Sequence, residues 1–263
     1  NLPMSSVLLD LHGGVARLTL NRPERLNSIN ADMRGALLAA IRRVGEEGAR
    51  ALIVTGAGRA FCTGQDLTER LMPAGAPPPD LGHSIEQFYK PLTLALRALP
   101  LPVIAAVNGA AAGAGASLAL ACDIVLAARS AVFIQAFCKV GLGPDGGGSD
   151  FLPRLVGTAR AMGLALTGEP LPAEQAAQWG LIWQCLDDER LMPEAEALAA
   201  RFAQGAPLAY AAVKRTLYAS AQNTLEQQLD LERDTQQTLG RSGDYREGVA
   251  AFMEKRPPAF KGK

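Results

Sequence analysis

The chain has 263 residues, of which 48% are hydrophobic, so it is long enough for one large or two small domains with a buried core. Lysine and arginine together number 26, as do aspartate and glutamate, and this balance leaves no net positive charge with which to hold a nucleic acid. Glycines, Asn108 and Asp123 interrupt the longest apolar stretch, which argues against a membrane-spanning helix.

The cysteines and histidines argue against a metal centre. The four cysteines lie far apart and form no CxxC pair: Cys62, Cys122, Cys138 and Cys185. Such cysteines are typical of reduced packing residues, so we expect a cytoplasmic protein. The two histidines, His12 and His83, belong to no metal-binding motif. The segment Asn1–Met4 lacks the basic and apolar regions that are expected of a signal peptide.

The first elements in chain order are a hairpin and a helix. Two β-rich runs, Val7–Leu11 and Val15–Asn21, flank the turn His12-Gly13-Gly14. Asn30 then predicts the cap of a helix over Ala31–Glu47, because the apolar positions within that range keep helical spacing.

Three buried strands and a helical second half follow. The runs Ala51–Thr55, Val103–Val107 and Asp123–Ala128 have few charges, which is typical of parallel strands covered on both faces. Between the first two, Pro73–Gly82 predicts an irregular loop long enough to be a mobile lid. From about Thr158 onward, helices are expected over Thr158–Thr167, Ala173–Trp179, Pro193–Gln204, Pro207–Ala219, Thr224–Gly240 and Tyr245–Glu254.

Glycine-rich turns after these strands allow three chemistries. Gly56-Ala57-Gly58 is similar to the opening of a dinucleotide fingerprint, but no helix follows at once. Gly115–Ala119 places Ser117 in a sequence like a nucleophile elbow, yet both histidines precede the serine, whereas that fold needs its histidine after it. A small residue where helix and strand pack closely is the simpler interpretation of Ser117.

The third chemistry is stabilisation of an oxyanion. Gly113-Ala114-Gly115 is expected to begin a helix, where backbone amides point outward and the helix dipole favours negative charge. Thr63-Gly64-Gln65 is a second turn of small residues that could present another amide. Two converging amides would form an oxyanion hole.

Several longer segments resemble the crotonase superfamily of enoyl-CoA hydratases and isomerases. In order they are Asn21-Arg22-Pro23, Asn27-Ser28-Ile29, Gly58–Leu67, Pro102–Gly109, Ala121-Cys122-Asp123-Ile124, Gly141–Gly148 and Phe252–Arg256. Together they extend over nearly the whole chain, in the order and spacing of that family.

The resemblance implies an α/β fold, a crotonase spiral of ββα turns with a C-terminal helical region. Residues 1–200 would form the core with the acyl-CoA site, and residues 201–263 the helices of a homotrimer or hexamer. The amides of Gln65 and Ala114 would form the oxyanion hole. Seven positions correspond to coenzyme A contacts, the last two of them made from a neighbouring subunit: Arg25, Leu26, Thr63, Asp66, Leu67, Phe252 and Lys255. Coenzyme A is part of the substrate, so no separate cofactor is implied.

The carboxylates distinguish activities within the family. Hydratases use two glutamates to activate water, and Ser117 and Ala136 stand at those positions here. A single carboxylate, Asp145, lies in the turn Gly143–Gly148. A turn or helix-cap aspartate would suit the same sequence. Because both glutamate sites are vacated while the oxyanion-hole segments remain, we predict that Asp145 is the catalytic acid or base.

A closer resemblance is carried by Pro78–Gly82, Glu86–Tyr89, Gly113–Ala116, Gly141–Asp145 and Leu229–Asp234. These segments are similar to family members that convert ring-1,2-epoxyphenylacetyl-CoA to the seven-membered oxepin-CoA in aerobic phenylacetate degradation. The resemblance implies an acyl-CoA isomerase, with Phe133, Phe137 and Leu142 expected around the ring. A linear-chain Δ3–Δ2-enoyl-CoA isomerase and a non-catalytic CoA-binding scaffold are the alternatives.

Overall fold

The computed structural model describes residues 5–263, so the segment Asn1–Met4 lies outside the described residues. The larger of two sheets contains, in spatial order, β1 (Val7–His12), β2 (Val15–Leu20), β3 (Ala51–Gly56), β5 (Val103–Val107), β7 (Ile124–Ala128) and β10 (Gln184–Leu186). β1 and β2 form the predicted antiparallel hairpin, and the remaining neighbours are parallel. The three runs predicted as buried strands are β3, β5 and β7.

The smaller sheet contains β4 (Ala60–Cys62), β6 (Ala110–Ala112), β8 (Val132–Ile134) and β9 (Leu171–Pro172). Three times the chain runs from a strand of the large sheet into a strand of the small sheet and then into helix: β3 to β4, β5 to β6 and β7 to β8. This repetition is the expected spiral of ββα turns. The short second strands were not predicted, because two or three residues are too few to show an alternation of burial.

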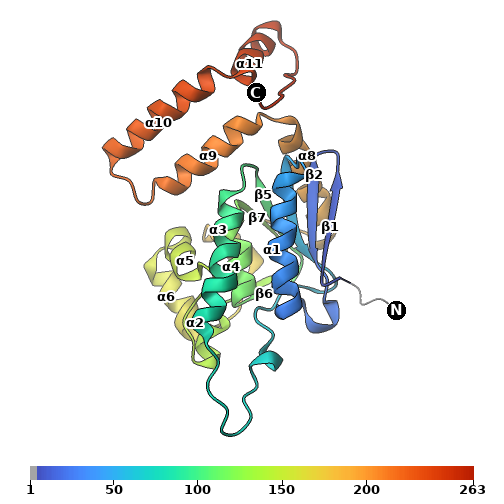
Figure 1. Cartoon of the computed structure of the whole chain (residues 1–263), viewed down its shortest axis with the longest axis vertical. Helices are drawn as coiled ribbons and strands as arrows, with labels where there is room; N and C mark the ends of the chain where they lie inside the picture. Colours follow the sequence, from blue (N-terminus) through green and yellow to red (C-terminus); the bar gives the residue numbers. More distant parts are fainter. Residues whose placement is uncertain (1–4) are drawn as a thin grey trace.

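Eleven α-helices lie within residues 5–263: α1 (Ala31–Glu46), α2 (Leu81–Ser84), α3 (Lys90–Ala98), α4 (Ala114–Ala121), α5 (Gly148–Val156), α6 (Thr158–Thr167), α7 (Ala173–Gln178), α8 (Leu191–Gln204), α9 (Pro207–Ala219), α10 (Leu225–Gly240) and α11 (Gly243–Glu254). α1 begins as predicted, since Asn30 Oδ1 accepts from Met33 N at 2.9 Å. No helix of this described part is long and apolar enough to cross a bilayer. Every residue of α4 is buried, so this helix lies at the centre of the molecule (Figure 1).

The turns that connect the two sheets after β3 and after β5 approach each other closely. At Gly109, between β5 and β6, an added Cβ would lie 2.1 Å from the backbone oxygen of Arg59. Only glycine allows this approach. Beside it, Asn108 Oδ1 accepts from Gly56 N at 3.1 Å, and its Nδ2 donates to Gly58 O at 3.0 Å. The turn after β3 is thereby fixed against the turn after β5.

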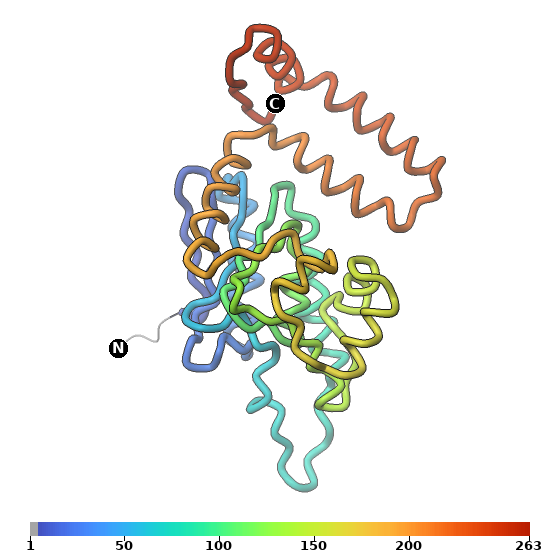
Figure 2. The backbone as a smooth tube through the Cα atoms, turned by 180° about the vertical axis from the view of Figure 1, so that it is seen from behind, coloured from blue at the N-terminus to red at the C-terminus, as the bar shows by residue number. Residues whose placement is uncertain are grey.

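The C-terminal helices extend away from this body. α9 and α10 form a hairpin that projects from it in both views, with α11 at the far end (Figure 1, Figure 2). The boundary predicted after residue 200 falls inside α8, which packs on β3 and β5. α9 is anchored by Lys214, whose Nζ lies 2.8 Å from Asp123 Oδ2 and donates to Leu101 O at 2.9 Å. Tyr218 donates to the other oxygen of the Asp123 carboxylate.

Candidate active site

A cavity of about 360 Å³ lies beside the start of α4, at the end of the molecule opposite α11. Its size is ordinary for a small-molecule site. Four segments form its wall: residues 63–70, residues 81–89, the start of α4, and residues 136–145. Of the residues predicted to act in catalysis or to bind coenzyme A, five line it: Thr63, Gln65, Leu67, Ala114 and Asp145.

Two backbone amides beside the cavity are free to donate. Gly64 O accepts from Ile29 N at 2.7 Å and Asp66 N donates to Ile29 O at 2.9 Å, so the amide of Gln65 between them points to the opposite side. Ala114 is the first residue of α4. Within residues 5–263 neither amide donates a hydrogen bond. The two segments adjoin, because a Cβ at Gly64 (φ +90°) would lie 3.3 Å from Ala114 N.

The side chain of Gln65 is held by three neighbours, which fixes its backbone amide. Its Oε1 accepts from the Tyr89 hydroxyl at 2.8 Å and from Arg34 Nη1 at 3.2 Å, and its Nε2 lies 3.4 Å from Glu69 Oε2. Tyr89 itself is buried, and this burial raises its pKa, so the phenol remains a proton donor at neutral pH. Tyr89 was not predicted as a site residue, because nothing in the sequence relates it to Gln65.

Asp145 presents a carboxyl group to the cavity. Its Oδ1 is buried and has no hydrogen-bond partner in the part of the chain that the structure describes. Burial raises its pKa to about 6. A carboxyl that titrates near neutrality suits proton transfer, since both of its forms are then accessible at working pH.

The turn that carries Asp145 is held by two hydroxyls. Ser117 Oγ donates to the backbone oxygen of Asp145 at 2.7 Å, and Thr93 Oγ1 donates to Gly146 O at 2.9 Å. Ser117 is buried on α4, as its interpretation as a packing residue predicts, but its hydrogen bond also orients the Asp145 turn. Ala136, the other vacated glutamate position, lines the cavity and supplies no acid.

The raised pKa of Asp145 predicts the pH dependence. If the carboxylate form is the base, kcat/KM should be low in acid and rise with pH to a plateau. The midpoint of this rise should lie near the pKa of about 6. An ordinary solvent-exposed aspartate would give a midpoint near ~4. The measurement is a pH–rate profile from pH 4 to 9 with a constant-ionic-strength buffer. A flat profile across this range would contradict the assignment.

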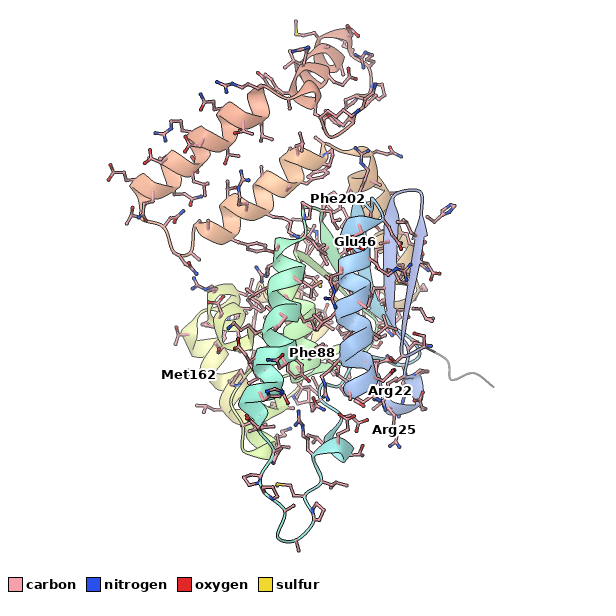
Figure 3. The ribbon with its side chains drawn as sticks, viewed as in Figure 1. Arg22, Arg25, Glu46, Phe88, Met162 and Phe202 are labelled. Carbon is pink, nitrogen blue, oxygen red and sulfur yellow. The ribbon has the colours of Figure 1, made fainter. Side chains whose placement is uncertain are left out.

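The predicted coenzyme A contacts lie in two places. Thr63 and Leu26 are adjacent, since Thr63 Oγ1 donates to Leu26 O at 3.3 Å, and Arg25 lies exposed nearby, beside Arg22 (Figure 3). The Asp66 carboxylate accepts from Thr68 and pairs with Arg22 at 3.0 Å, and these contacts lower its pKa although burial acts in the opposite direction. This carboxylate is therefore engaged within the protein, and it carries no proton-transfer role.

Phe252 and Lys255 lie on and after α11, far from the cavity within one chain (Figure 1). Both are exposed, Phe252 by 82%. Within one chain, α11 and the segments that line the cavity lie at opposite ends of the molecule (Figure 1). A contact with a ligand in a neighbouring subunit stays a prediction.

Two of the three apolar residues expected around the ring of the acyl group line the cavity. Phe137 and Leu142 line the cavity, joined by Leu81, Ile85 and Val140. Phe133 on β8 is not among the residues that line the cavity; it is 2% exposed and belongs to the hydrophobic core.

A larger cavity of about 790 Å³ lies between α3, α5 and α9. Two acids line it, and both are paired: Asp123 with Lys214 at 2.8 Å, and Asp150 with Arg154 at 2.9 Å. Neither is free for proton transfer, so this cavity is the poorer candidate. Within residues 5–263 no group of three histidine, cysteine or acidic side chains could hold a metal ion.

Comparison with known proteins bears on the whole chain. A family model described as Enoyl-CoA hydratase/isomerase matches residues 10–263. The chain is 54% identical over 261 residues to the 1,2-epoxyphenylacetyl-CoA isomerase of Escherichia coli (strain K12), which covers 99% of this chain and 100% of that protein. It is 35% identical over 263 residues to the trans-2-decenoyl-[acyl-carrier-protein] isomerase of Streptococcus mutans, covering 100% of both. A crystal structure of enoyl-CoA hydratase from Bacillus anthracis superposes with a TM-score of 0.92 at 33% identity, covering 98% of this chain and 100% of that one.

Proposed function

We propose that this chain, which belongs to the enoyl-CoA hydratase/isomerase family, is an acyl-CoA isomerase with Asp145 as its acid and base. The fold expected from the sequence is confirmed. One observation carries the proposal: Asp145 is the single acid that lines the cavity among residues 5–263, and the cavity also holds two free amides. Its proposed substrate is ring-1,2-epoxyphenylacetyl-CoA, and its product oxepin-CoA. The sequence identity of 54% to a relative named 1,2-epoxyphenylacetyl-CoA isomerase supports this choice of substrate.

The proposed reaction is a shift of one proton. The amides of Gln65 and Ala114 bind the thioester oxygen, and the Asp145 carboxylate removes a proton from the α-carbon. The resulting dienolate keeps its charge on the oxygen in the oxyanion hole. Asp145, now protonated, returns the proton at the γ-carbon, so that a β,γ double bond becomes an α,β double bond.

The same proton shift completes the ring expansion. Opening of the ring carbon–carbon bond of the epoxide gives an oxepin whose double bond lies β,γ to the thioester, and the α-proton then moves to the ring γ-carbon. The sequence is redox neutral and consumes no water, so it requires no cofactor besides the coenzyme A of the substrate. An apolar wall that keeps water out protects the strained epoxide from hydrolysis.

The sequence is compatible with two other functions. A linear-chain Δ3–Δ2-enoyl-CoA isomerase would use the same residues and the same proton shift, and the identity of 35% to a decenoyl isomerase keeps it as the second candidate. A non-catalytic CoA-binding scaffold would not explain why Asp145 has a buried oxygen without a hydrogen-bond partner. Isomerisation is therefore the better-supported class.

The test is incubation with enzymatically prepared 1,2-epoxyphenylacetyl-CoA and identification of the product by mass and NMR. Oxepin-CoA is the expected product. A linear 3-enoyl-CoA and crotonyl-CoA are run in parallel. Hydration of crotonyl-CoA should be negligible beside isomerisation, because Ser117 faces the Asp145 turn and Ala136 has no acid. Efficient hydration would refute the assigned site, and binding without turnover of either isomerase substrate would favour the scaffold.

We further propose that the protein acts as a homotrimer or hexamer in the cytoplasm. The projecting α9–α10 hairpin leaves large apolar side chains exposed, among them Leu217, Leu225 and Leu229, and a second subunit could cover them. Phe252 and Lys255 would then reach the coenzyme A of a neighbouring subunit. The four cysteines form no disulfide, which suits a reducing compartment.

This assembly makes a kinetic prediction for Lys255. Lys255→Ala should raise KM with little change in kcat, because a phosphate contact away from the reacting carbons contributes equally to substrate and transition-state binding. Steady-state kinetics with the isomerase substrate gives both constants, and Lys263→Ala serves as the control. An unchanged KM for the Lys255 variant would count against a contact between this side chain and coenzyme A.

A further inference from the structure

Arg70 is a charged side chain of the cavity wall that the proposed proton shift does not use. It ends the 3₁₀ turn Leu67–Arg70 and lines the cavity together with Ser84 of α2. Its Nη2 donates to Ser84 Oγ at 3.0 Å. Its Nε is buried and has no hydrogen-bond partner within residues 5–263. A buried guanidinium N–H without an acceptor is unfavourable, and an acceptor from a bound ligand would remove that cost.

Neighbouring acids do not supply that acceptor. Glu69 accepts from Ala31 N at 2.9 Å and pairs with Arg34 at 3.4 Å. Asp66 pairs with Arg22, and Asp80 caps α2 by accepting from His83 N at 2.8 Å. Across the described part of the chain, Arg70 is absent from every ion pair between an arginine and a carboxylate.

A second donor lies beside Arg70 in the cavity wall. Ser84 Oγ accepts from Arg70, which leaves its own hydroxyl proton to donate to a second group. Burial raises the pKa of Tyr89, Asp145 raises it further, and Arg70 lowers it, so Arg70 and Asp145 both act on the same phenol. Leu81, three residues before Ser84, and Ile85, directly after it, are part of the apolar wall.

We propose that Arg70 and Ser84 form a subsite for an oxygen atom carried by the acyl group, of the kind found in a ring epoxide or a cyclic enol ether. This inference rests on the proposed function and adds to it a reason for preferring oxygenated acyl groups. A neutral ring oxygen accepts from the guanidinium without the desolvation penalty that a carboxylate would bring. An acyl group with a methylene in that place leaves the buried Nε unpaired, and selectivity follows from that difference.

The test compares two unreactive thioesters that differ in one atom. Tetrahydrofuran-2-ylacetyl-CoA has a ring oxygen where cyclopentylacetyl-CoA has a methylene. Calorimetric titration of the full-length protein should show about 10-fold tighter binding of the oxygen compound, as expected for one charged hydrogen bond. Arg70→Met should abolish this preference while leaving the affinity for cyclopentylacetyl-CoA unchanged within about twofold, and Ser84→Ala should reduce it.

Three binding results would each overturn the proposed subsite. A wild-type protein without the preference, or an Arg70→Met variant that keeps it, overturns the proposal. Equal weakening of both thioesters by Arg70→Met also overturns it, because the guanidinium would then contact the coenzyme A that both share. Arg42→Met, at an exposed arginine of α1, is the matched control. Binding needs no turnover, so this result is independent of whether the epoxide is the substrate.

Discussion

Replacing Asp145 by asparagine should lower kcat by at least about 100-fold, the loss typical of a missing acid or base, while thioester binding persists. Asparagine keeps the shape of the side chain and can serve the same turn. It cannot take the α-proton. The kinetic measurement should show kcat and kcat/KM falling together, which is the signature of an interaction made only in the transition state.

The same variant separates catalysis from stability. Burial raises the pKa of Asp145 from the ordinary aspartate value of about 3.9 to about 6, so the folded protein holds this proton more tightly than the unfolded chain does. The stabilising effect of the protonated form is present below pH ~4 and is lost as the pH rises to about 6. Asp145→Asn carries no charge to bury, so at pH 7 it should melt no lower than the wild type. A variant that folds, binds and still turns over at near wild-type rate would identify Asp145 as a turn residue.

Removing the carboxylate of Asp123 should destabilise the protein by about 3–5 kcal/mol, the range for breaking a buried ion pair by deleting one partner. Its side chain is 13% exposed and that of Lys214 8%, so Asp123→Ala would leave the lysine charge without its carboxylate in the interior. The same carboxylate accepts from Val103 N at 2.8 Å and from Tyr218, which joins β5 to α9. Urea denaturation followed by circular dichroism measures the change in free energy of unfolding.

The control for this prediction is Asp150→Ala. Asp150 pairs with Arg154 at 2.9 Å, but the two side chains are 57% and 49% exposed, so water screens the pair. Its removal should change the free energy of unfolding by less than about 1 kcal/mol. Equal losses in the two variants would mean that burial of the Asp123–Lys214 pair is not what stabilises the attachment of α9.

The sequence by itself determined the elements whose residues carry a local signal. The apolar runs of β3, β5 and β7 and the Asn30 cap of α1 were predicted close to their observed bounds, because burial on both faces and capping are properties of a few consecutive residues. The family, its fold and the single carboxylate at position 145 were likewise evident from ordered motifs and from the residues at positions 117 and 136.

The tertiary structure alone decided which side chains meet. Ser117 lies 28 residues from Asp145, and Tyr89 lies 24 residues from Gln65; their hydrogen bonds arise only when the spiral brings successive turns together. The unpaired Nε of Arg70 is a property of its surroundings, and so is the raised pKa of Asp145. Phe252 and Lys255 ended far from the cavity of their own chain, because the α9–α10 hairpin carries α11 outward. Such distances depend on the packing of the whole molecule, whereas capping and strand burial depend on near neighbours in the chain.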